Sequence, residues 1–170
     1  MQGQEALLKE IFELALANDA EYGGCTQSVL AALQEKLNVV SADVFRAGSA
    51  LSGGVAAQGE TCGALTGAIM AIGCLVGRTK LEDRETYRKS LQPAMEVYCR
   101  FSEKIGHTLC WEIHKIRYGR FFRLGIPEEH VAFINAGGHS RRGCPEVCGI
   151  AARIAAEVIL EMKEKDRESN

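Results

Sequence analysis

Hydrophobic residues recur along this chain at intervals of three and four, as on one face of an α-helix, and no segment alternates as a β-strand does. The first stripe comprises Leu7, Leu8, Ile11, Phe12 and Ala15. Gly23-Gly24 breaks this pattern, and we expect a second helix to start at about Cys25. Ser41 or Asp43 can cap a short third helix.

Residues 62–76 form the most apolar segment, with almost no charge on any side. A helix that is apolar all round must be surrounded by other helices, so this one is predicted to be central. Gly63 and Gly67 remove side chains at points where a neighbouring backbone or a cofactor can approach. Close packing is the favoured interpretation of these glycines, and approach of a cofactor is the alternative.

The second half of the chain continues the helical pattern. The charged residues 80–89 open a fifth helix, in which Pro93 predicts a kink or a division into two shorter helices. Thr108 can cap a sixth helix, and Pro127 suits the first turn of a seventh. The last helix is predicted to start at Pro145.

The pattern therefore predicts an all-α protein, a single domain over residues 1–170 with six to eight helices around a central small-residue helix. A length of 170 residues with 46% hydrophobic and 25% charged residues fits one globular domain. The net charge of −2 gives no reason to expect nucleic acid as a partner. Residues 62–76 are too short to span a bilayer, and a homodimer is expected because the central helix needs more cover.

Seven cysteines are an odd number, and the first apolar run is interrupted by Glu5, Lys9 and Glu10, unlike a signal peptide. Together these features predict a reducing compartment, the cytoplasm, and argue against a secreted disulfide scaffold. Some of the cysteines are then free thiols, metal ligands or redox partners.

Four cysteines fall where the pattern starts a helix: Cys25, Cys62, Cys110 and Cys144. The positive end of a helix dipole lowers the pKa of a thiol there, and the thiolate is the form that binds metals and exchanges disulfides. Because no CxxC pair is present, a shared site has to be assembled by the fold.

The other cysteines and the histidines have weaker signals. Cys148 lies one helical turn after Cys144, where the two can share a metal or act as separate thiols. Cys74 and Cys99 are interpreted as core residues. Imidazole is a common metal ligand, but a structural role is favoured for His107, His114 and His139.

Several short motifs occur in an order known from one family. They are Gly24-Cys25-Thr26-Gln27-Ser28-Val29, Gly53-Gly54, Gly59-Glu60, Cys62-Gly63-Ala64-Leu65-Thr66-Gly67, Cys110 and Cys144-Pro145-Glu146-Val147. In them the chain resembles the C_GCAxxG_C_C family of small cysteine-rich proteins, which are described as redox-active and are often encoded near transporter genes. The resemblance runs from about residue 21 to residue 161 and places the family's four cysteines on Cys25, Cys62, Cys110 and Cys144.

The segment from Cys110 through Gly119-Arg120 and Pro127-Glu128-Glu129 to the last predicted helix also resembles the C-terminal part of split-Soret cytochromes. This resemblance implies an iron–sulfur cluster of the 2Fe–2S type, and the chain has no CxxCH motif that would imply haem. Cys148 stands where a valine-like residue is expected, which makes it a fifth candidate ligand.

Three hypotheses follow. The first is a redox protein that transfers or senses electrons through an iron–sulfur cluster and an unknown redox partner, with Gly63 and Gly67 letting the backbone close over the site. Its expected ligands are Cys25, Cys62, Cys110 and Cys144, with Cys148 in reserve. The second is a metal-free thiol/disulfide oxidoreductase, and the third is a zinc-stabilised helical module associated with a transporter. No catalytic residue is assigned, and whether the protein is an enzyme stays open.

Overall fold

The computed structural model describes residues 2–168, so residues 1 and 169–170 of the predicted domain lie outside the described range. Within that range the chain forms eight α-helices, one short 3₁₀-helix and no strand, which confirms the all-α prediction. The elements are α1 (Gln2–Tyr22), α2 (Cys25–Leu37), α3 (Ala42–Gly48), η1 (Ser49–Leu51), α4 (Gly63–Val76), α5 (Arg84–Ile105), α6 (Cys110–Tyr118), α7 (Pro127–Asn135) and α8 (Cys144–Glu168).

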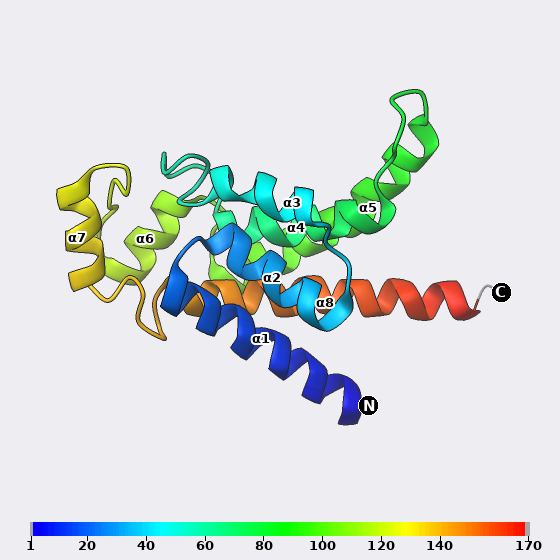
Figure 1. Ribbon diagram of the computed structural model, residues 1–170, viewed down its shortest axis with the longest axis horizontal. Coiled ribbons are helices and arrows are strands. Elements are labelled where there is room, and N and C mark those ends of the chain that lie inside the picture. Colours follow the sequence, from blue (N-terminus) through cyan, green and yellow to red (C-terminus); the bar gives the residue numbers. More distant parts are fainter. Residues whose placement is uncertain (1, 169–170) are drawn as a thin grey trace.

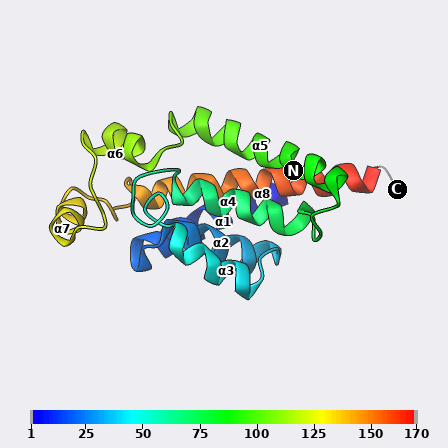
Figure 2. The same cartoon turned by 90° about the horizontal axis from the view of Figure 1, so that it is seen from above.

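The long helix α8 forms the axis of the molecule, and α1, α2, α4 and α5 pack along it (Figure 1). The apolar helix α4 lies inside this bundle as predicted, between α2, α5 and α8. Helices α6 and α7 both lie beyond the end of the bundle at which α8 begins (Figure 2). This end of the molecule carries the candidate site.

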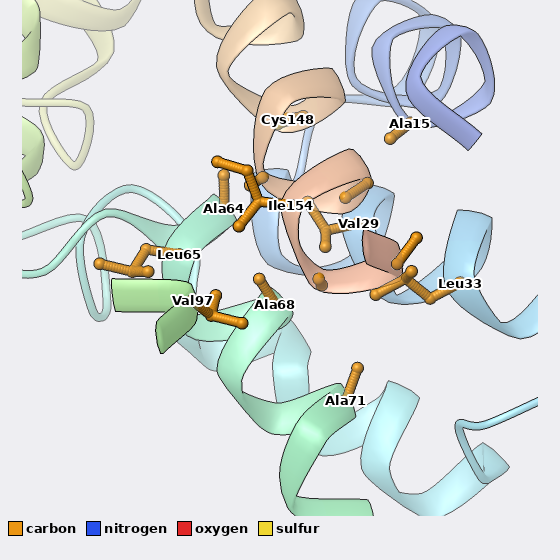
Figure 3. Packing of buried hydrophobic residues seen from close by; sticks show 14 of the residues in the cluster. Ala15, Val29, Leu33, Ala64, Leu65, Ala68, Ala71, Val97, Cys148 and Ile154 are labelled. Atoms are coloured by element: carbon orange, nitrogen blue, oxygen red, sulfur yellow. The ribbon is translucent and has the colours of Figure 1, made fainter. Parts of the chain in front are cut away.

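Small side chains let the helices approach closely. Ala64, Ala68 and Ala71 of α4 are completely buried, and Figure 3 shows them directed toward the neighbouring helices. A Cβ atom on Gly67 would lie 2.6 Å from the backbone oxygen of Thr26 in α2. This contact confirms close packing as the reason for Gly67.

The helix boundaries agree with most of the sequence signals. Ser41 caps α3, because its Oγ accepts a hydrogen bond from the backbone N–H of Val44. Pro127 is the first residue of α7. The structure describes no helix between residues 2 and 168 that is both long enough and apolar enough to cross a membrane.

Two boundary details differ from the predictions. Helix α5 runs through Pro93 without division into two helices, because Val97 and Phe101 beyond the proline are completely buried and fix it against the bundle, and the predicted kink stays a prediction. Tertiary packing of this kind outweighs one missing backbone hydrogen bond. Thr108 does not cap α6, because the N-cap residue of this helix is Leu109. The hydroxyl of Thr108 lies 3.2 Å from the Tyr98 hydroxyl instead.

Candidate functional site: a cavity lined by thiols

Four cysteines stand at four helix starts. Cys25, Cys110 and Cys144 are the first residues of α2, α6 and α8, and Cys62 is the N-cap residue of α4. The predicted positions are therefore confirmed. Because these helices begin at the same end of the bundle, segments far apart in the sequence meet there (Figure 2).

A cavity of about 460 Å³ lies at this meeting point. All five candidate cysteines line it: Cys25, Cys62, Cys110, Cys144 and Cys148. Its remaining wall is largely apolar, with Ile113, Phe133 and Val147 among the lining residues. The fold thus brings the five cysteines, which are carried by α2, α4, α6 and α8, to one cavity.

Cys74 and Cys99 lie outside the cavity, and both are exposed. The prediction that they belong to the core is wrong, because no other helix within residues 2–168 covers the faces of α4 and α5 that carry them. They are therefore natural controls for experiments on the five cavity cysteines.

The state of the cavity thiols differs from the sequence prediction. All five are free, and burial raises the pKa of each one, to about 12 for Cys62. The predicted lowering of the pKa by helix dipoles is therefore wrong here. Loss of hydration in an apolar cavity outweighs the dipole, and neighbouring negative charges act in the same direction. The free cysteines are neutral thiols at neutral pH.

His114 and Tyr118, on α6, lie beside the thiols. The Nε2 atom of His114 is 3.7 Å from Cys110 Sγ and 3.8 Å from Cys144 Sγ. The hydroxyl of Tyr118 donates a hydrogen bond to Cys144 Sγ over 3.7 Å. Burial lowers the pKa of His114 to about 4 and raises that of Tyr118, so both side chains are neutral.

A buried carboxylate also lines the cavity. Asp19, near the end of α1, is 1% exposed, and its Oδ2 atom has no hydrogen-bond partner among the described residues. The nearest cationic group is the Nδ1 atom of half-buried His139, 3.8 Å away. Interaction with Asp19 raises the pKa of His139, which favours the charged pair.

A left-handed turn forms one wall of the cavity. Residues 53–57 have five consecutive positive φ angles of 67, 72, 58, 51 and 61°. A Cβ atom on Gly54 would lie 2.6 Å from Cys110 Cβ, and the backbone of Gly53 forms a hydrogen bond that partly offsets the raised pKa of Cys25. Val55 is β-branched, so its left-handed conformation is strained by about 1–2 kcal/mol.

Gly63 determines how closely α4 approaches Cys25. A Cβ atom on Gly63 would overlap Cys25 Sγ and would lie 2.8 Å from Thr26 Oγ1. The glycine at the start of α4 therefore leaves the space that the Cys25 thiol occupies. A larger residue at position 63 would therefore disturb both the packing of α4 against α2 and the position of the Cys25 thiol.

These positions can be compared with known proteins. A family model described as "Putative redox-active protein (C_GCAxxG_C_C)" matches residues 24–158. The chain belongs to the C_GCAxxG_C_C family. No curated protein and no solved structure matches the chain.

The matched range includes all five cavity cysteines of this C_GCAxxG_C_C protein, whereas Asp19 lies before it. In residues 2–168 no group of three or more His, Cys, Asp or Glu side chains is placed to hold a single metal ion. The thiols are distributed around the cavity wall. Such a site offers soft sulfur donors to a group larger than one ion, or neutral thiols to a redox reaction.

Proposed function

We propose that this C_GCAxxG_C_C protein holds an iron–sulfur cluster, of the 2Fe–2S type, in the thiol-lined cavity and transfers or senses electrons. One observation carries the proposal: cysteines from the starts of four helices line a single cavity of about 460 Å³. Iron–sulfur clusters are held by cysteine thiolates, and the cavity supplies at least four sulfur donors. When bound, such a cluster supplies reversible one-electron transfer.

The residues of the cavity have separate roles in this proposal. Cys25, Cys62, Cys110 and Cys144 would hold the group. Each thiol would release its proton on binding, so a raised thiol pKa makes binding weaker at low pH and stronger as pH rises. The apolar wall would exclude water from the sulfurs, and Gly63 and Gly67 let α4 and α2 close on one another.

Cys144 is favoured over Cys148 as the fourth donor. Cys144 has polar neighbours that suit a charged sulfur, the Tyr118 hydroxyl and His114 Nε2. Cys148 is completely buried, and its thiol donates a hydrogen bond to the backbone oxygen of Cys25 over 3.8 Å. A thiol that donates this hydrogen bond keeps its proton, whereas a thiol that binds a cluster releases it.

The two alternatives have less support. A metal-free thiol/disulfide oxidoreductase needs a thiolate at neutral pH, whereas burial raises the pKa of every cavity thiol. A structural zinc site needs four donors around one ion, and the described side chains do not converge on such a point. Both alternatives remain outcomes of the experiment below.

The experiment is to purify the protein without oxygen and to measure iron, zinc, acid-labile sulfide and the visible spectrum. The proposal expects iron and sulfide in equal amounts, lost in Cys62→Ser and retained in the matched control Cys74→Ser on the same helix. Zinc without sulfide would favour the structural alternative. A colourless, metal-free protein that forms a reversible disulfide between cavity cysteines would favour thiol exchange and overturn the proposal.

A reducing compartment such as the cytoplasm is part of the proposal, since all seven cysteines are free thiols.

The redox partner, the homodimer and the link to a transporter stay predictions. Apolar side chains remain exposed on α5, among them Leu91 and Met95, with exposed fractions of 47% and 62%. Sedimentation equilibrium measures the homodimer directly, and a single species of 18.5 kDa would contradict it.

A further inference from the structure

His114 is a buried side chain of the cavity wall that is not among the proposed cluster ligands. It lies on α6, one helical turn after Cys110, and is 1% exposed. A histidine that is buried away from water has to find partners for both ring nitrogens inside the protein, or leave one of them without a partner.

Aromatic rings hold the imidazole of His114 in one orientation. Phe133 stacks on it with ring centroids 5.1 Å apart and 19° between the planes. Tyr118 and Phe122 present their edges to it, at centroid distances of 5.6 and 6.0 Å. Because rings contact the imidazole from several sides, it cannot turn to exchange its two nitrogens without displacing them.

The two ring nitrogens have very different surroundings. Nε2 faces two sulfurs, Cys110 Sγ at 3.7 Å and Cys144 Sγ at 3.8 Å. Nδ1 is buried and has no hydrogen-bond partner in the part of the chain that the structure describes. A buried N–H without an acceptor is rarer than a buried acceptor without a donor. The proton of a neutral ring therefore belongs on Nε2, between the two sulfurs.

We propose that His114 donates its Nε2–H to the sulfurs of Cys110 and Cys144 and sets the reduction potential of the group they hold. The effect on the potential rests on the proposed function, whereas the assignment of the proton does not. A hydrogen bond to a ligand sulfur stabilises the reduced, more negative state and raises the potential. His114 is a positioning residue in this proposal, since it acts through the two cysteines.

The first test compares the reduction potential of the loaded wild-type protein with those of two variants. His114→Phe keeps an aromatic ring between Tyr118, Phe122 and Phe133 but removes the N–H donor, so the potential should shift to a more negative value. His114→Gln places an amide N–H near the position of Nε2 and should restore most of the shift. A potential that is unchanged in His114→Phe, in a variant with full iron and sulfide, overturns the proposal.

The second test does not require a cluster. The ¹⁵N shifts of the imidazole nitrogens, measured on protein labelled with [¹⁵N]histidine and assigned through His114→Phe, report which nitrogen carries the proton. The proposal expects protonated Nε2 and unprotonated Nδ1 for His114 at neutral pH. Protonated Nδ1, or protonation of both nitrogens, overturns it.

The two failures can be told apart. A wild-type protein without iron and sulfide overturns the proposed function, and the ¹⁵N measurement on that metal-free protein then decides the role of His114. A loaded wild-type protein with an Nδ1–H ring overturns the role of His114 and leaves the proposed function standing.

Discussion

Replacement of Gly67 by alanine tests how closely α4 and α2 approach each other. The new Cβ atom would lie 2.6 Å from the backbone oxygen of Thr26 and 3.3 Å from its Cα atom. Because the obstacle is backbone in the middle of the bundle, a helix has to shift. Overpacking of this kind costs about 1–3 kcal/mol.

Alanine also has a better helix propensity than glycine, by about 1 kcal/mol. The net effect of Gly67→Ala is therefore a loss of about 0–2 kcal/mol in the free energy of unfolding. Gly73 provides the matched control, since it lies in the same helix and a Cβ atom there would meet nothing within 4 Å. Gly73→Ala should gain about 1 kcal/mol from propensity alone.

Urea unfolding and thermal unfolding, each followed by circular dichroism, measure both variants. The two variants should differ by about 1–3 kcal/mol, and for a chain of this length about 1 kcal/mol moves the melting temperature by roughly 2–4 °C, so they should melt roughly 2–12 °C apart. If Gly67→Ala is as stable as Gly73→Ala, the close approach of α4 to Thr26 is refuted. The explanation that small residues on α4 let the neighbouring helices pack closely would then fail as well.

Three further predictions concern the cavity and the residues around it. In Gly63→Ala the new Cβ atom takes the space of the Cys25 thiol, so the iron bound per chain should fall. A full iron content would contradict the assignment of Cys25 as a cluster ligand. Val55→Gly relieves the backbone strain of a β-branched residue in the left-handed conformation, so it should raise the free energy of unfolding by up to about 1 kcal/mol. Urea unfolding measures this change, and a loss of stability would show that Val55 is not strained. Asp19 raises the pKa of His139, so this pair stabilises the fold fully below about pH 6.5, the ordinary pKa of histidine, and loses that effect as pH rises through the raised value. The melting temperature of the wild type should exceed that of His139→Gln most at low pH, and a difference that does not change with pH would refute the coupling.

Local signals in the sequence predicted the positions of the helices well. Gly23-Gly24, Ser41 and Pro127 each act on the backbone of their own segment, and each stands at a helix boundary in the structure. The starts at Cys25 and Cys144 followed from the same kind of signal. Pro93 left a kinked helix and two shorter helices open, because packing far along α5 decides whether a helix continues through a proline, and that packing is not local.

The cavity itself could be predicted only in part. The cysteines at helix starts indicated a shared site, but the protonation of the thiols depends on burial, which arises from helices that are distant in sequence. No motif marked Asp19 or His114, which stand out because Asp19 Oδ2 and His114 Nδ1 have no hydrogen-bond partner among the described residues. One available signal was the spacing of His114 four residues after Cys110, which places both on one face of α6.

The joining of distant helix starts has a consequence for the lifetime of the protein. Cys25 and Cys144 lie more than a hundred residues apart and line the same cavity. A group bound by both would close that loop in the unfolded chain, as a disulfide of similar span does, and would contribute about 4–5 kcal/mol. This is a large share of the roughly 5–15 kcal/mol that holds a domain folded, and proteases remove chains that unfold. The amount of this protein in a cell would then follow the supply of whatever its thiols bind.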